Sequence, residues 1–105
     1  MKRQPFFSVI IPTFNREILL KKAVDSVLKQ TFKDFELIIL DDGSTDNTFK
    51  LISSFSDKRI IYKKQTNSGV AHARNRAIDI SKGDFITFLD SDDRWVDSKL
   101  ETTFQ

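Results

Sequence analysis

The chain has 105 residues, so one domain with a modest hydrophobic core is the default expectation. It carries 17 basic and 15 acidic residues, and the basic ones are scattered, so nucleic acid is not an expected partner. Cysteine is absent, which excludes disulfides and thiolate zinc sites. No stretch approaches the roughly 20 consecutive apolar residues that a membrane helix needs, so no transmembrane segment is expected.

Apolar runs and helical periods alternate along the chain. Strands are expected at residues 6–11, 35–40, 59–62 and 85–89. Helices are expected at residues 16–29, after a cap signal at 44–47, at 68–81 and at 95–104. This β-α-β-α-β-α-β-α order with short links predicts an α/β fold: a mostly parallel, Rossmann-like sheet with flanking helices.

Several residues are expected to cap or end these elements. Pro12 should end the first strand, because proline has no N–H to donate to a sheet. Thr13 or Asn15 should cap the first helix through a side-chain oxygen. Gly83 should close the third helix in a left-handed conformation.

Two adjacent carboxylates, Asp41 and Asp42, follow the second strand. Open α/β sheets bind ligands at the carboxyl ends of their parallel strands, where an acidic side chain commonly accepts a hydrogen bond from a ribose hydroxyl or a base. Turn and cap chemistry explains the following residues 44–47 equally well. It explains the two adjacent carboxylates less well.

A second acidic cluster, Asp90-Ser91-Asp92-Asp93, follows the fourth strand. Side chains alternate along a strand, so Asp90 and Asp92 can point to the same side. Two or three such oxygen ligands suit Mg²⁺ or Mn²⁺. A simpler alternative is that Ser91, Asp92 or Asp93 caps a helix around Trp95, and both roles are compatible.

No glycine-rich phosphate-binding loop occurs in this sequence, which has three glycines. A pyrophosphate bound here would lack a cradle of backbone N–H groups and would face several carboxylates. Electrostatics then requires a cation between them. The missing loop and the acidic cluster together indicate a metal-bridged diphosphate.

Three further positions are candidates for ligand contacts. Phe14 could stack on a nucleobase, although an aromatic side chain is more often part of a core. Gly69 belongs to a helix start where free N–H groups favour an anion, although small residues there also permit close packing. Arg74 could neutralise phosphate, or it could pair with an Asp at a strand end.

Five segments of the chain match the motif order of a known family. They are residues 9–16 (VIIPTFNR), 30–38 (QTFKDFELI), 41–46 (DDGSTD), 67–75 (NSG and ARN) and 90–93 (DSDD). Together, over nearly the whole chain, they resemble family 2 glycosyltransferases with the GT-A fold. Each motif alone is weak, and the resemblance rests on their order and spacing.

The resemblance implies a nucleotide-diphospho-sugar donor, most often a UDP-sugar, and Mn²⁺ or Mg²⁺ as cofactor. It implies transfer of the sugar to a hydroxyl of a saccharide or lipid-linked acceptor, with inversion. A cytoplasmic location follows, with the protein peripheral at the inner face of the membrane.

The expected donor site comprises Pro12, Thr13, Phe14, Asp41, Asp42, Gly69, Arg74, Asp90 and Ser91. By the resemblance, Phe14 flanks or stacks on the base, Asp42 binds the base edge, and Pro12 and Thr13 shape the pocket. Asp92 contacts the metal directly, and Asp90 binds the metal, its water or the ribose.

The family's catalytic base, acceptor pocket and later strands lie beyond residue 105. Residues 1–105 are therefore expected to form a single, truncated nucleotide-sugar-binding domain that binds donor without turnover. The fourth strand should present an unpaired edge with bare apolar surface, which self-association would cover.

Three other functions remain open on the sequence. A nucleotidyltransferase also places metal-binding carboxylates at strand ends, but it would be expected to carry a Gly-rich, Lys-bearing loop after the first strand. A receiver-type signalling domain needs an acidic pair at that position, where Pro12-Thr13-Phe14 stands. The third is a non-catalytic binding or assembly module.

Overall fold

A computed structural model of the chain describes residues 4–104. Within this range the strands are β1 (Phe7–Thr13), β2 (Phe35–Asp41), β3 (Ile60–Lys64) and β4 (Phe85–Phe88). The helices are α1 (Glu17–Leu28), α2 (Thr48–Ser53), α3 (Val70–Ile80) and α4 (Lys99–Phe104). The predicted alternation of strands and helices is confirmed, with most boundaries within two residues of the expected ones.

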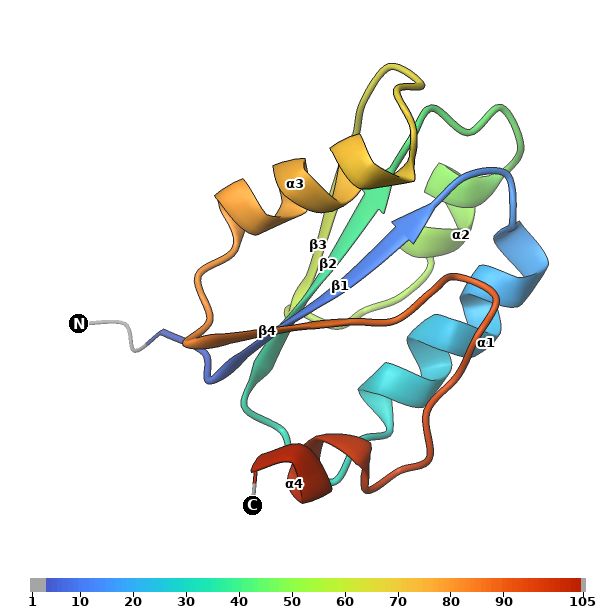
Figure 1. The fold of residues 1–105 in the computed structure, drawn as a ribbon. Coiled ribbons are helices and arrows are strands. Elements are labelled where there is room, and N and C mark those ends of the chain that lie inside the picture. Colours follow the sequence, from blue (N-terminus) through green and yellow to red (C-terminus); the bar gives the residue numbers. More distant parts are fainter. Residues whose placement is uncertain (1–3, 105) are drawn as a thin grey trace.

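The strands form one parallel sheet in the order β3-β2-β1-β4, with the helices on its two faces (Figure 1). The predicted α/β class is therefore confirmed. β1 and β2 are buried along their whole length, as their nearly continuous apolar sequences predict for strands covered on both sides. Their carboxyl ends, which carry Thr13 and Asp41, lie side by side in register.

Alternate residues of the central strands build two separate cores. Val9, Ile11 and Leu37 face α1 and α2 in the larger core, which also contains Leu100 of α4. Ile10 and Ile38 face α3, where they pack against alanines in a smaller core. Period-two alternation along the strands thus assigns α3 to one face of the sheet and the other helices to the opposite face (Figure 1).

Pro12 does not end the first strand, so that prediction is wrong. β1 continues through Thr13 and pairs Pro12 with Leu40 of β2. Ile10 accepts a hydrogen bond from Leu89, so the even-numbered residues of β1 direct their backbone groups toward β4. The pairing with β4 ends at Ile10, so β4 presents no paired carbonyl that would require an N–H donor at Pro12. Proline is therefore tolerated at this position of the strand.

The predicted cap of the first helix is also wrong. Arg16 occupies the N-cap position of α1 without a side-chain hydrogen bond. A carboxylate from another loop serves instead, because Asp46 accepts a hydrogen bond from the N–H of Glu17 at 3.4 Å. Asn15 acts in the reverse direction, and its Oδ1 accepts from the N–H groups of Thr45 and Asp46 at 2.8 and 3.3 Å. These exchanged bonds join the loops that follow β1 and β2.

No helix begins at Trp95, so the predicted helix over residues 95–104 is wrong in its first half. α4 starts at Lys99, and residues 89–98 lie outside helices and strands. Ser91, Asp92 and Asp93 therefore cap no helix at Trp95.

Gly83 is needed for a reason other than the predicted left-handed conformation. Positive φ among the glycines occurs at Gly43 and Gly69, and Gly83 is not in that group. A Cβ on Gly83 would lie 2.5 Å from the backbone nitrogen of Ser8 and 2.6 Å from the carbonyl carbon of Phe7. Close approach to β1 excludes a side chain at this position.

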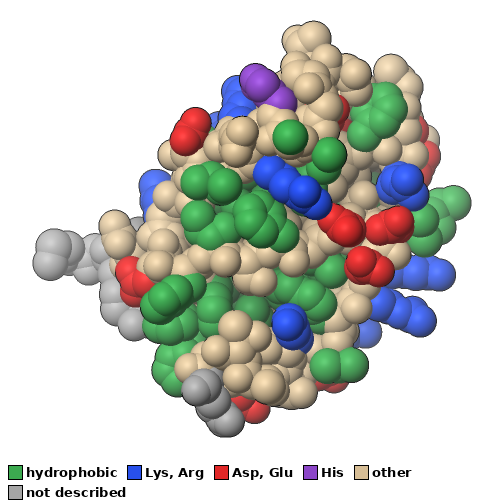
Figure 2. All heavy atoms as spheres, in the orientation of Figure 1, with side chains coloured by type: hydrophobic (Ala, Val, Ile, Leu, Met, Phe, Trp, Pro, Cys, Tyr) green, Lys and Arg blue, Asp and Glu red, His purple; other side chains and the backbone are tan. Residues whose placement is uncertain are grey.

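Strand β4 forms one edge of the sheet, as the sequence predicts. Its side chains Phe85, Ile86 and Phe88 are exposed. Apolar side chains gather on the face of the molecule over β4 and α3, next to a group of acidic ones (Figure 2). Among the described residues no helix is both long and apolar enough to cross a membrane.

Candidate functional site

A pocket of about 480 Å³ lies at the carboxyl ends of the central strands. It is lined by Pro12, Thr13, Phe14, Arg16, Asp42, Val70, Ala73, Arg74, Asp90, Ser91 and Asp92. The structure thus brings together all the residues expected in the site except Asp41 and Gly69. These two lie just outside the lining.

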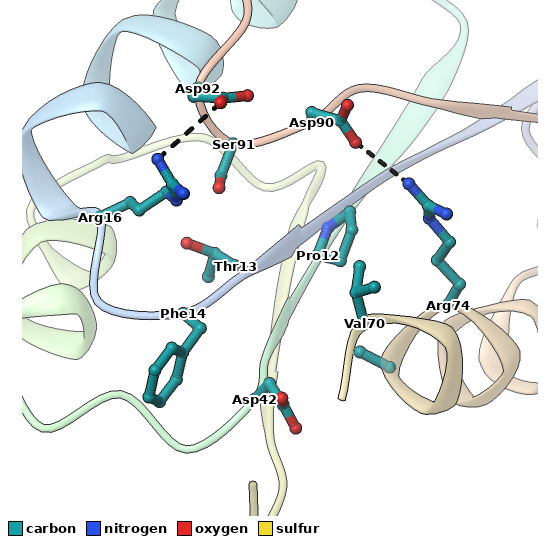
Figure 3. Close-up of a pocket in the computed structure, with 11 residues that line it drawn as sticks. Pro12, Thr13, Phe14, Arg16, Asp42, Val70, Arg74, Asp90, Ser91 and Asp92 are labelled. Carbon is teal, nitrogen blue, oxygen red and sulfur yellow. Dashed lines mark hydrogen bonds and ion pairs between the residues drawn. The ribbon is translucent and has the colours of Figure 1, made fainter. Parts of the chain in front are cut away.

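The pocket has two chemically different ends (Figure 3). Phe14, whose side chain is exposed, lies near Asp42 at one end. Asp90 and Asp92 lie at the other end, with Thr13 and Ser91 between them and Phe14. One end thus presents an aromatic ring beside a single carboxylate, and the other end presents two carboxylates.

Asp42 is a buried carboxylate whose oxygens are occupied by the loop between β3 and α3. Its Oδ1 accepts from Gln65 Nε2 at 2.9 Å and from the N–H of Ser68 at 2.7 Å. Its Oδ2 accepts from the N–H of Gly69 at 2.9 Å and from Asn67 Nδ2 at 3.3 Å. The anion expected at the start of this helix is therefore a side chain of the protein itself.

The environment of Asp42 favours its charged form. Burial by itself raises the pKa, but the hydrogen bonds from Gln65, Ser68 and Gly69 outweigh it, so the pKa of Asp42 lies below its ordinary value of 3.8. A charged carboxylate here holds the start of α3 against the end of β2.

Asp41 is fully buried beneath the pocket. Its Oδ1 accepts from the N–H of Ser44 at 2.9 Å, and its Oδ2 accepts from the Tyr62 hydroxyl at 2.5 Å. Burial, followed by this hydrogen bond, raises the pKa of Tyr62, so the phenol keeps its proton. Both Asp41 oxygens thus serve the local structure.

The acidic cluster after β4 remains open to solvent. One carboxylate oxygen from each of Asp90, Asp92 and Asp93 lies within 4.8 Å of the others. Arg74 Nη2 lies 3.1 Å from Asp90, and Arg16 Nη1 lies 3.8 Å from Asp92. Exposed ion pairs of this kind contribute about 0–1 kcal/mol, so both arginines can change partners at little cost.

Two polar atoms in the pocket walls lack partners. Thr13 Oγ1 and Arg74 Nε are buried and make no hydrogen bond within residues 4–104. Buried polar atoms without partners are uncommon and often mark a place that a ligand or water fills. Both atoms belong to residues that line the pocket.

Sequence reasoning missed Arg16, Val70 and Ala73 as pocket residues. Arg16 could have been predicted, since it stands two residues after Phe14 at the start of a predicted helix. Nothing in the sequence identifies Val70 and Ala73 as pocket residues, because their position depends on how closely α3 packs on the sheet.

The chain matches the family model described as "Glycosyl transferase family 2" over residues 8–105. It belongs to this family, and its structure closely matches those of glycosyltransferases with the GT-A fold. The strand order β3-β2-β1-β4 also differs from the order 2-1-3-4-5 of receiver domains.

Two relatives illustrate the similarity. A UDP-Glc:alpha-D-GlcNAc-diphosphoundecaprenol beta-1,3-glucosyltransferase of Escherichia coli is 45% identical over 95 residues, which cover 90% of this chain and 38% of that protein. A GalNAc(5)-diNAcBac-PP-undecaprenol beta-1,3-glucosyltransferase of Campylobacter jejuni is 42% identical over 105 residues, with 96% of this chain and 34% of that protein covered. The chain thus spans little more than a third of either relative.

Solved structures agree with the fold. S. aureus TarS 1-349 in complex with UDP-GlcNAc superimposes with a TM-score of 0.90 at 35% identity, covering 94% of this chain and 30% of that one. A mannosyltransferase from Pyrobaculum calidifontis in complex with GDP-Man and Mn²⁺ superimposes with a TM-score of 0.80 at 27% identity, covering 90% and 29%.

We predict that Asp42→Asn lowers the free energy of unfolding at pH 7 by about 1–3 kcal/mol, because an amide cannot accept all of these hydrogen bonds. A lowered pKa stabilises the fold at pH values above 3.8, and this contribution is lost as the pH falls further. Urea unfolding at several pH values should therefore show a flatter acid dependence for Asp42→Asn than for the parent. An unchanged acid dependence would show that Asp42 does not stabilise this loop as a charged group.

Proposed function

We propose that these residues form the donor half of a glycosyltransferase active site. The pocket binds a nucleotide-diphospho-sugar, with a UDP-sugar as first candidate, together with Mn²⁺ or Mg²⁺. The observation that carries this proposal is the two-ended pocket, with Phe14 and Asp42 at one end and Asp90 and Asp92 at the other (Figure 3).

The nucleoside lies at the Phe14 end. The Phe14 ring, 44% exposed, offers its face to a base, and such stacking is worth about 1–3 kcal/mol. Asp42 already accepts from four donors, which is about the capacity of a carboxylate. A base N–H can therefore reach Asp42 directly only by replacing the longest of these contacts, from Asn67 at 3.3 Å.

The diphosphate lies at the acidic end. Asp90, Asp92 and Asp93 provide the hard oxygen ligands that Mg²⁺ and Mn²⁺ prefer, close enough together to share one ion. A cation bound there neutralises the charge that develops on a diphosphate leaving group. Arg74 supplies an additional donor to phosphate oxygen, since its Nε has no hydrogen-bond partner within residues 4–104.

The acceptor class follows from the relatives. Their names give diphosphoundecaprenol-linked saccharides as acceptors and UDP-Glc as a donor. We extend this class to the protein that contains this chain, with transfer to an acceptor hydroxyl and inversion at the sugar. Such an acceptor is anchored in a membrane, so the protein works at the cytoplasmic face of that membrane.

Calorimetric titration of the chain with UDP, GDP and ADP, with and without Mn²⁺, tests the donor site. UDP should bind more tightly with Mn²⁺ than without, and Asp92→Ala should weaken the Mn²⁺-dependent binding by about tenfold or more, or about 1.4 kcal/mol. Asp79→Ala is the control, because this exposed carboxylate of α3 lies outside the pocket. Equal binding by the parent and Asp92→Ala would contradict the assignment.

The chain alone should bind donor without turning it over. The described pocket presents three carboxylates, of which Asp42 is occupied by four donors and Asp90 and Asp92 belong to the cation end. None is then free to remove a proton from an acceptor hydroxyl. Incubation with UDP-sugars, Mn²⁺ and a panel of acceptors should release no UDP with glycoside product, and such release would refute this prediction.

The bare edge of β4 should also promote self-association of the chain. Phe85, Ile86 and Phe88 stay exposed along this edge, where unpaired backbone groups are available to a second copy. Light scattering should show the average mass rising with protein concentration, and Phe85→Lys with Phe88→Lys should suppress the rise. A clean monomer at high concentration would argue against pairing at this edge.

A further inference from the structure

Gln30, just beyond the end of α1, is a fully buried polar side chain. Its Nε2 donates to the carbonyl of Ser26 at 3.1 Å and to that of Val96 at 2.7 Å. Its Oε1 accepts from the N–H of Leu100 at 2.9 Å. A buried amide whose donors and acceptor are all satisfied fixes its partners firmly. Gln30 therefore ties the end of α1 to the segment that follows the acidic cluster.

Two neighbours of Gln30 hold the same segment. Ser26 Oγ accepts from the N–H of Trp95 at 3.0 Å while donating to the Ala23 carbonyl. The N–H of Thr31 donates to the carbonyl of Asp97 at 2.9 Å. The end of α1 thus contacts the backbone of the segment at residues 95, 96, 97 and 100.

The acidic cluster, residues 90–93, lies in the chain between this attachment and strand β4 of the sheet. On its N-terminal side, the N–H of Leu89 donates to the carbonyl of Ile10 in β1 at 2.9 Å. On its C-terminal side, the first attachment is Trp95. Residues 90–94 have no helix or strand of their own, and their carboxylates repel one another. Besides a backbone turn bond between residues 93 and 90, the cluster is held by the exposed ion pairs with the two arginines, which are weak. The position of the cluster therefore depends largely on the two backbone attachments.

We propose that Gln30 is a positioning residue for the cation end of the donor site. It does not line the pocket, and it acts through the backbone of residues 95–100 on the placement of Asp90 and Asp92. This inference rests on the proposed function, because it assumes that the acidic cluster binds a cation. Glutamine suits the task because one amide satisfies both a carbonyl and an N–H of an irregular segment.

Three variants of the chain test this role. Gln30→Met keeps a similar volume and removes all three hydrogen bonds of the amide. Ser26→Ala removes the bond to Trp95 together with the bond that Ser26 Oγ donates to Ala23 within α1. Ile52→Ala is the control, because it weakens the same large core, which also contains Leu89 and Leu100, and leaves the hydrogen bonds of Gln30 and Ser26 in place. Each variant is studied at a temperature where it is folded.

Two measurements separate positioning from general loss of stability. Amide hydrogen exchange of residues 90–98, supported by the fluorescence of Trp95, the one tryptophan of the sequence, reports the attachment itself. Calorimetry gives the affinity for UDP with and without Mn²⁺. Gln30→Met should speed amide exchange of residues 90–98. It should also weaken Mn²⁺-dependent binding of UDP by about tenfold, the lower end of the effect seen for residues that orient metal ligands. Binding of UDP without Mn²⁺ should stay unchanged. Ser26→Ala should act in the same direction less strongly, and Ile52→Ala should match the parent.

Each alternative result has a defined meaning. Unchanged exchange at residues 90–98 in Gln30→Met, or in Ser26→Ala if Gln30→Met does not fold, overturns the positioning role without reference to any ligand. Faster exchange with unchanged Mn²⁺ affinity overturns it as well. A parent chain that binds no nucleotide with Mn²⁺ refutes the proposed function instead, and the exchange experiment still decides whether Gln30 fixes the segment.

Discussion

The arrangement of the site depends on one buried carboxylate and the donors around it. Asp42 directly follows β2 in the pocket wall, and the groups that donate hydrogen bonds to it come from residues 65–69, which lead into α3. These bonds fix where α3 begins, and therefore where Val70 and Arg74 stand in the pocket wall. The sequence suggests that Asp42 is available to a ligand. In the structure its carboxylate instead joins the ends of β2 and β3 to the start of α3.

The two acidic strand ends have opposite physical states. Asp41 and Asp42 are buried, and the protein itself satisfies their oxygens. Asp90 and Asp92 are exposed, close together and held only by weak pairs with arginines. The first pair builds the pocket, and the second pair is left available to charge brought from outside. A bound cation would relieve the repulsion that the fold leaves in place.

The sequence was sufficient for the order of elements and for most of the pocket, because both follow from local patterns. Continuous apolar runs predict buried strands, and parallel strands bring their carboxyl ends to one edge. Prediction from the sequence failed where a residue distant in the chain determines the local structure. Pro12 is tolerated because β4 ends early, and α1 is capped by Asp46 from another loop. In the sequence Gln30 is recognisable only as part of a motif, since the partners that define its role lie 66 and 70 residues away.

The smaller core sets a dimension of the pocket. α3 meets the sheet through Ala73 and Ala77, both fully buried, and alanine allows a helix to approach closely. Arg74 is carried by the same turn of helix as Ala73, so the thickness of this thin layer determines how far its guanidinium stands from Asp90. The breadth of the pocket thus depends on two methyl groups, of which that of Ala73 also lines the pocket and that of Ala77 lies behind it in the core. A larger side chain at position 77 would change the width of the pocket without entering it.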